Sequence, residues 1–69
     1  MDELTNTIAL LRATRQLSQT ELAEAIGVSR KTISTVETGR FTPSVIIALK
    51  LAKFFDVPVE QIFILNKVT

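Results

Sequence analysis

The chain has 69 residues, of which 46% are apolar and 22% are charged, and this composition is typical of one small globular domain. It contains no cysteine and no histidine, so one modest apolar core has to stabilise the fold without disulfides or a histidine metal site. The longest apolar run, residues 45–49, is too short to span a bilayer, and the N-terminus is acidic. We therefore expect a cytoplasmic protein with no membrane segment, no metal and no cofactor.

The net charge of +1 is unevenly distributed along the chain. Residues 28–53 contain one acidic side chain, Glu37, and five basic ones, so this segment has a net charge of +4. Ordinary solvated helix faces would explain such a composition. Basic residues on and beside one recognition element would instead indicate a protein that binds nucleic acid. The five basic residues are Arg30, Lys31, Arg40, Lys50 and Lys53.

The N-terminal third of the chain predicts two helices. Ile8 and Leu11 give a one-sided apolar face to a first helix over about residues 6–15, with Asn6 or Thr5 as its cap. Ser18, followed three residues later by a glutamate, forms a capping box, so a second helix is expected over residues 19–26.

A third short helix is expected over residues 30–37, with Ser29 as its N-cap and Gly39 in the left-handed conformation after its end. Gly27 ends the second helix and permits a tight turn with a positive φ. Where two helices cross close to a turn, large side chains are excluded. Ala23 is therefore expected at the crossing, with Ile33 and Val36 pointing inward from the third helix.

The stretch LSQTELAEAIGVSRKTISTVETGRFTPS, followed by ALKLAKFFDVPVEQIF, resembles the lambda repressor and Cro family of helix-turn-helix DNA-binding domains, also called XRE-type regulators. The resemblance covers nearly the whole chain. It implies an all-α fold of five helices in a single domain over residues 1–69, with the helix-turn-helix at residues 18–38. It also implies that the third helix enters the major groove of double-stranded DNA while the second lies across the phosphate backbone.

By this resemblance, four residues of the third helix lie where the family reads base edges. An arginine donates two hydrogen bonds to guanine, a lysine reaches guanine or phosphate, and hydroxyls make short adaptable contacts. A solvated polar helix face is the alternative interpretation. The expected base contacts are Arg30, Lys31, Ser34 and Thr35.

Six further residues match positions at which the family contacts the sugar-phosphate backbone. Gln19 begins the second helix, and Ser44 is expected to cap a fourth helix whose free amides attract a phosphate. Ordinary loop and cap chemistry would explain the same residue types. The expected phosphate contacts are Gln19, Thr32, Thr38, Arg40, Thr42 and Ser44.

The resemblance also assigns structural roles. Arg12 and Glu37 match an ion pair that joins the first helix to the end of the third, although desolvation offsets much of its attraction. Two independent surface charges are the alternative. Gln16 and Asp56 stand where the family often has glycine, so both are expected in the left-handed conformation at a cost of roughly 1 kcal/mol each.

The C-terminal tail, about residues 59–69, has more apolar side chains than so small a core can bury. It either forms a self-complementary patch or short strand at a two-fold dimer interface, or folds back on its own domain. The expected interface residues are Phe63, Ile64, Leu65 and Val68.

These features together predict a dimeric, sequence-specific repressor of transcription that reads a palindromic operator. The alternative is an antitoxin-like or controller protein whose main partner is another protein, bound through the apolar tail. An enzyme is disfavoured, because the sequence has no histidine, no cysteine and no glycine-rich phosphate loop. No small-molecule pocket is expected.

Overall fold

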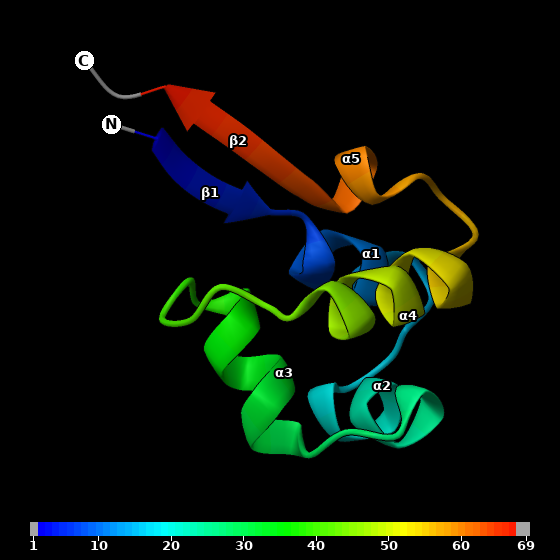
Figure 1. Cartoon of the computed structure of the whole chain (residues 1–69). Coiled ribbons are helices and arrows are strands. Elements are labelled where there is room, and N and C mark those ends of the chain that lie inside the picture. The colour runs from blue at the N-terminus through cyan, green and yellow to red at the C-terminus, as the bar shows by residue number, and fades with distance from the viewer. Residues whose placement is uncertain (1, 68–69) are drawn as a thin grey trace.

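The computed structural model describes residues 2–67, and this part of the chain folds into five helices and a two-stranded sheet (Figure 1). The five helices of the expected all-α fold are therefore confirmed, and the described chain is mainly helical with one small sheet. None of the helices in residues 2–67 is long and apolar enough to cross a membrane. In chain order the elements are β1 (Asp2–Asn6), α1 (Ile8–Thr14), α2 (Gln19–Ile26), α3 (Arg30–Glu37), α4 (Val45–Phe55), α5 (Val59–Ile62) and β2 (Phe63–Lys67).

Helices α2 and α3 begin and end at the residues that their capping signals predict. Ser18 Oγ accepts a hydrogen bond from the Glu21 amide, and the Glu21 carboxylate accepts one from the Ser18 amide, which completes the capping box. Ser29 Oγ accepts from the Thr32 amide at the start of α3. Gly27 and Gly39 have φ values of 76° and 78°, so the turns after both helices require the left-handed conformation that glycine adopts without strain.

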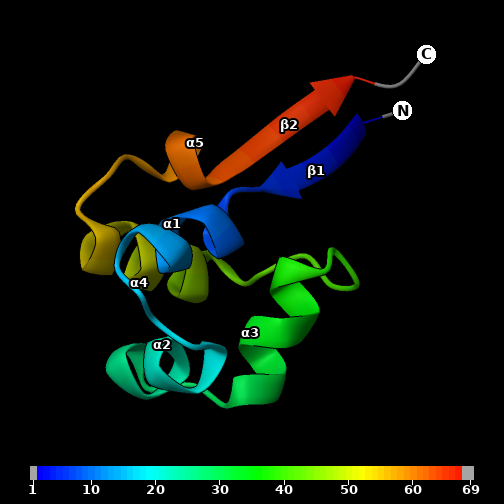
Figure 2. The same cartoon turned by 180° about the vertical axis from the view of Figure 1, so that it is seen from behind.

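The core lies where all five helices meet. The crossing of α2 and α3 contributes Ala23, Ile33 and Val36, which are 2%, 0% and 4% exposed, so the predicted inward positions are confirmed. Both views place α1 and α4 between the β1–β2 sheet and the α2–α3 pair (Figure 1, Figure 2). The other buried apolar residues are Ile8, Leu22, Ile26, Leu51, Phe55 and Ile62.

The N-terminal strand β1 is the main feature that the sequence did not predict. It pairs antiparallel with β2, with Asn6 opposite Phe63 and Leu4 opposite Leu65. The first helix consequently begins at Ile8 rather than near residue 6, and it ends at Thr14. The C-terminal tail therefore supplies the expected short strand, but that strand pairs with β1 of its own chain along one edge.

Two helix ends use a non-glycine residue in the left-handed conformation, as the departures from the family pattern predict. Gln16 has a φ of 57° after α1, and Asp56 has a φ of 55° after α4. Both turns keep their backbone hydrogen bonds: the Leu17 amide donates to Arg12 O, and the Val57 amide donates to Ala52 O. The strain of roughly 1 kcal/mol per residue is thus tolerated without a change of fold.

Candidate nucleic-acid interface

Helix α3 presents a polar face with two exposed cations. Ile33 and Val36 point into the core, which turns the opposite side of the helix to solvent. Arg30 and Lys31 are exposed, and within residues 2–67 neither side chain makes a hydrogen bond or an ion pair. Both groups are therefore free to donate to an external acceptor.

The hydroxyl groups of α3 are more constrained. Thr35 Oγ1 donates to the carbonyls of Lys31 and Thr32, at 2.9 and 3.1 Å. Thr38 Oγ1 donates in the same way to Ser34 O at 2.9 Å. A threonine whose proton is used inside the helix offers an external partner an acceptor oxygen and a methyl group. A phosphate contact by Thr38 would therefore require its hydroxyl to rotate away from the helix.

The remaining hydroxyls of the predicted contacts lie on or beside α3. Ser34 is half-buried and makes no side-chain hydrogen bond among the described residues. The Thr32 hydroxyl pairs with Ser29 Oγ at 2.8 Å in the cap of the helix. Of the predicted base contacts, Ser34 and the two cations of the first turn are therefore the side chains that retain free donors.

The C-terminal end of α3 is fixed by an ion pair. Arg12 Nε and Nη2 donate to the two oxygens of the Glu37 carboxylate at 2.9 and 2.8 Å, and Arg12 Nη1 donates to Leu17 O. Gln19 Nε2, from the start of α2, lies 3.4 Å from the same carboxylate. The Arg12 side chain is 18% exposed and the Glu37 side chain is 12% exposed. The hydrogen bonds from Arg12 lower the pKa of Glu37 below its ordinary value. One carboxylate thus joins α1, α2 and α3.

The loop between α3 and α4 carries the next two predicted phosphate contacts. Arg40 and Thr42 are exposed and have no side-chain hydrogen bond within residues 2–67. Ser44 caps α4 as expected, because its Oγ accepts from the Ile47 amide at 3.1 Å. The first amides of a helix have no partner inside the helix, so this capped end favours an anion.

Arg15, Lys50 and Lys53 do not lie on α3 or on the loop after it. Arg15 donates to the carbonyls of Phe54 and Phe55 at the end of α4, at 3.1 and 2.9 Å, and its guanidinium lies over both rings. Lys50 and Lys53 line a hollow with residues of α2, and the lining of that hollow includes no residue of α3. Within the +4 segment, the three basic residues on α3 and the loop after it are therefore Arg30, Lys31 and Arg40.

Two polar side chains make bonds to helix ends that the sequence did not predict. Arg15 and Asn6 both donate to carbonyl groups at helix ends, and the acceptors of Asn6 are Val36 O and Glu37 O of α3. The acceptors lie 30 or more residues away along the chain, so no local spacing could have identified them.

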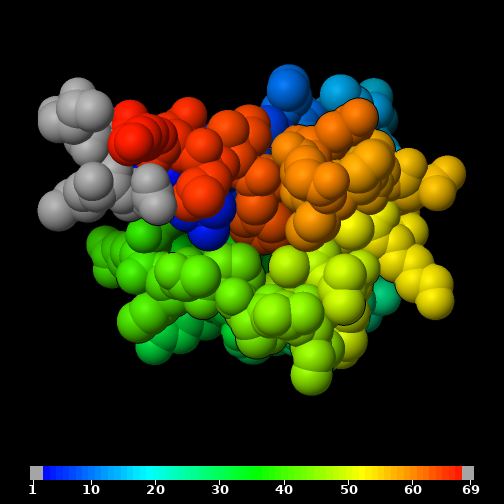
Figure 3. Space-filling view, turned by 45° about the horizontal axis from the view of Figure 1, so that its top comes forward, coloured from blue at the N-terminus to red at the C-terminus, as the bar shows by residue number. Residues whose placement is uncertain are grey.

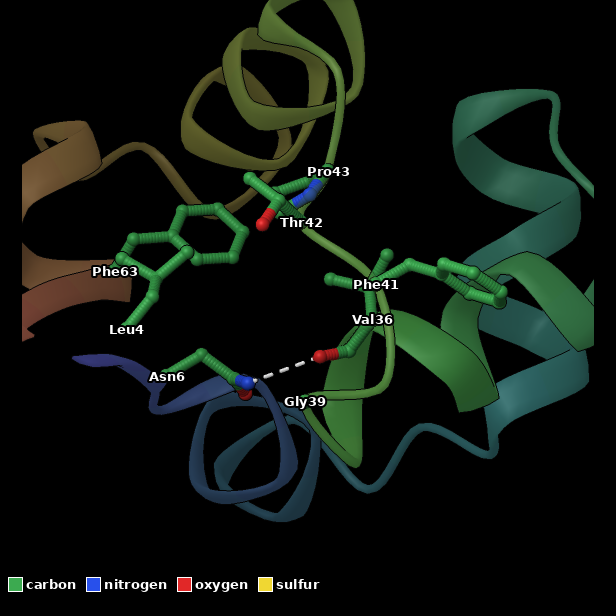
Figure 4. Close-up of a pocket in the computed structure, with 8 residues that line it drawn as sticks. All are labelled: Leu4, Asn6, Val36, Gly39, Phe41, Thr42, Pro43 and Phe63. Atoms are coloured by element: carbon green, nitrogen blue, oxygen red, sulfur yellow. Dashed lines mark hydrogen bonds between the residues drawn. The ribbon is translucent and has the colours of Figure 1, made fainter. Parts of the chain in front are cut away.

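The expected interface residues of the tail differ in exposure. Phe63 is half-buried and lines a hollow between the sheet and the α3–α4 loop (Figure 4). Ile64 is 41% exposed and Leu65 is 69% exposed, whereas Val68 lies outside the described residues. The loop residue Phe41 and three residues of α4 are also more than half exposed, and Figure 3 shows β2 and the start of α4 on one face of the molecule. The three α4 residues are Val45, Ile46 and Leu49.

The chain is similar to known helix-turn-helix proteins. The family model described as helix-turn-helix matches residues 8–62. An uncharacterized HTH-type transcriptional regulator, MJ0272 of Methanocaldococcus jannaschii, is 48% identical over 59 residues, which cover 86% of this chain and 89% of that protein.

Two crystal structures have the same fold. One is a putative DNA-binding protein from Bacteroides fragilis, with a TM-score of 0.75 and 30% identity, over 87% of this chain and 97% of that chain. The other is the restriction-modification controller protein C.AhdI from Aeromonas hydrophila, with a TM-score of 0.70 and 34% identity, over 77% of this chain and 80% of that chain.

Proposed function

Since the chain belongs to the helix-turn-helix family of DNA-binding transcriptional regulators, we propose that it represses transcription by occupying an operator, with α3 in the major groove. One observation carries this proposal: α3 has exposed cations at its first turn, and its last residue is held in place by other helices. Arg30 and Lys31 lie on α3 and have no side-chain partner within residues 2–67, while Glu37 at the other end of the helix is held by donors from α1 and α2. A rigid helix with free donors is suited to direct readout of bases.

In this proposal the contacts divide by chemistry. Arg30, Lys31 and Ser34 supply donors to base edges, and Thr35 supplies an acceptor oxygen and a methyl group. The phosphate contacts come from the start of α2, the edge of α3, the following loop and the capped end of α4. They are Gln19, Thr32, Thr38, Arg40, Thr42 and Ser44. The protein acts by binding alone, without catalysis, and it does so in the cytoplasm with the DNA it regulates.

Selection of bound duplexes from a random pool tests this function. A repressor of the proposed kind enriches one sequence, and its affinity for that sequence falls as salt concentration rises, because phosphate contacts release counterions. Enrichment of no sequence would refute the proposal. The enriched sequence also shows whether the site is an imperfect palindrome.

We further propose that the protein binds DNA as a homodimer, with the exposed Ile64 and Leu65 on β2 at the interface. A two-fold dimer would place two copies of α3 in successive major grooves about 34 Å apart. Phe63 packs against the core of its own chain and so joins this surface to the rest of the domain.

Charged substitutions distinguish this surface from others. Ile64→Asp is expected to give a folded monomer by circular dichroism and sedimentation, with much weaker operator binding and largely retained non-specific binding. Leu10→Asp is the matched control, because Leu10 is 65% exposed on α1. Dissociation by Ile46→Asp alone would instead place the interface on α4. A wild-type monomer at tens of micromolar that binds a half-site fully would refute the dimer.

A further inference from the structure

The side chain of Asn6 connects three elements of the fold. Its Nδ2 donates to Val36 O at 3.1 Å and to Glu37 O at 3.2 Å, at the C-terminal end of α3 (Figure 4 shows the first of these). Its Oδ1 accepts from the Ile8 amide at 3.1 Å, at the start of α1. Asn6 itself is the last residue of β1.

These bonds satisfy groups that a helix leaves open. The last carbonyls of an α-helix have no partner inside the helix. Val36 O also accepts from the Gly39 amide, but among the described residues no backbone amide outside the helices and strands donates to Glu37 O. Asn6 therefore supplies the bond that ties the last carbonyl of α3 to the rest of the molecule.

The backbone of Asn6 is held in place from the other side. Asn6 pairs with Phe63 in the sheet, and the next amide, that of Thr7, donates to Ile62 O at 2.9 Å. Leu4 and Phe63 lie on the same side of the hollow as Asn6 (Figure 4). The amide group that contacts α3 is thus anchored to β2 and α5.

The end of α3 consequently has two separate attachments. Arg12 and Gln19 hold the carboxylate of Glu37, and Asn6 holds its carbonyl group. An eight-residue helix is about 12 Å long, so a tilt of about 10° at one end moves the other end by about 2 Å. Direct readout requires placement within about 0.5 Å, so the attachment of one end determines whether donors at the other end reach their bases.

We propose that Asn6 is a positioning residue for DNA recognition: it fixes the end of α3 to the β1–β2 sheet and so sets the pose in which Arg30 and Lys31 meet the base edges. This inference rests on the proposed function of α3. Asn6 does not itself contact DNA. Its loss therefore lowers the preference for the operator more than it lowers the attraction to phosphates.

Asn6→Asp tests the proposal, because it retains an acceptor for the Ile8 amide but replaces the donor that faces α3 with an anionic oxygen. Asn66→Asp is the matched control: Asn66 is exposed on β2, and its Nδ2 donates to Thr5 Oγ1 at 3.0 Å rather than to α3. Both variants add one negative charge to the same sheet, so general repulsion of DNA is common to the two. Asn6→Ser, which is neutral and too short to reach α3, gives the same test without an added charge.

The readout is fluorescence anisotropy on the selected operator and on a scrambled duplex, with circular dichroism melts of each variant. Asn6→Asp and Asn6→Ser are expected to lose about tenfold or more in the ratio of operator to scrambled affinity, which corresponds to about one direct base contact. Asn66→Asp is expected to keep the wild-type ratio.

Three results would overturn the inference. If folded Asn6 variants discriminate between the duplexes as well as the wild type does, Asn6 is only a structural residue, even if their melting temperature falls. If Asn66→Asp lowers the ratio of operator to scrambled affinity as much as Asn6→Asp does, the effect comes from the added charge or from a disturbed sheet and not from the bonds of Asn6 to α3. A wild-type protein that does not discriminate refutes the proposed function, and the role of Asn6 fails with it.

Discussion

Replacement of Ala23 by leucine tests the packing that positions α3. The Ala23 side chain is 2% exposed at the crossing of α2 and α3. Its carbonyl accepts from the Val28 amide at 2.9 Å in the turn between the helices, so the backbone at this position has little freedom to retreat. Leucine would add three carbon atoms where two backbones approach closely.

The expected cost follows from the two opposing effects of those atoms. Burial of three more carbons would stabilise the fold by about 0.8 kcal/mol each if the space existed. Since protein interiors are close-packed, the added atoms instead displace α3 or force poor rotamers, and overpacking of this kind costs about 1–3 kcal/mol. For a domain of this size, each kcal/mol lowers the melting temperature by roughly 4–8 °C.

Thermal melts followed by circular dichroism measure the effect, with Ala25→Leu as the control. Ala25 is on the same helix but exposed, so the same chemical change there should alter the free energy of unfolding by less than about 0.5 kcal/mol. A displaced α3 should also weaken operator binding. Melting of Ala23→Leu at or above the wild-type temperature would show that the crossing is not closely packed.

The remaining predictions concern DNA contacts, pH and the turn. Arg30→Ala should cost about 1–3 kcal/mol on the selected operator and relax preference at one base pair; an equal loss on random duplexes would reduce Arg30 to a phosphate contact. Arg40→Ala should weaken binding to all duplexes alike and lower the salt slope by about 1, and an unchanged slope would contradict a phosphate contact. Because the pKa of Glu37 is lowered in the fold, its ionised carboxylate stabilises the folded state above the ordinary glutamate pKa of about 4.3, and this stabilisation is lost as pH falls through the lower folded pKa. The melting temperature should therefore fall less between pH 6 and pH 3 for Glu37→Gln than for the wild type, and an equal fall in both proteins would argue against this contribution. Gly27→Val should destabilise the fold by more than about 1 kcal/mol, because valine is strained at a φ of 76°. The strain lies in the backbone and not in a clash, because the nearest atom to an added Cβ is a lysine nitrogen 3.9 Å away. An unchanged melting temperature would refute this prediction.

Local signals in the amino-acid sequence specify the helix-turn-helix unit. Helices α2 and α3 begin at a serine whose oxygen caps an amide three residues later, and a left-handed glycine lies at or just beyond their ends. Each of these signals acts within a few residues, so the order of side chains specifies it directly. The inward positions of Ala23, Ile33 and Val36 follow from helical periodicity in the same way.

The family resemblance, rather than any spacing, supplied the pairing of Arg12 with Glu37. The two residues are 25 positions apart, and a bidentate geometry between them depends on how α1 meets α3. The resemblance also predicted the five helices, but it did not predict that the Arg15 guanidinium would bond the carbonyl groups at the end of α4.

The sheet and the attachments of α3 depend on contacts between distant parts of the folded chain. The first strand is five residues long, and its partner begins 57 positions after its last residue, so no local period predicts the pairing. The same holds for Asn6 and Arg15, whose amide and guanidinium groups bond carbonyls that are 30 or more residues distant. A backbone carbonyl is present at every position, so the sequence does not mark it as an acceptor. The folded chain selects the acceptor, because only there does a helix end come within reach of a side-chain donor.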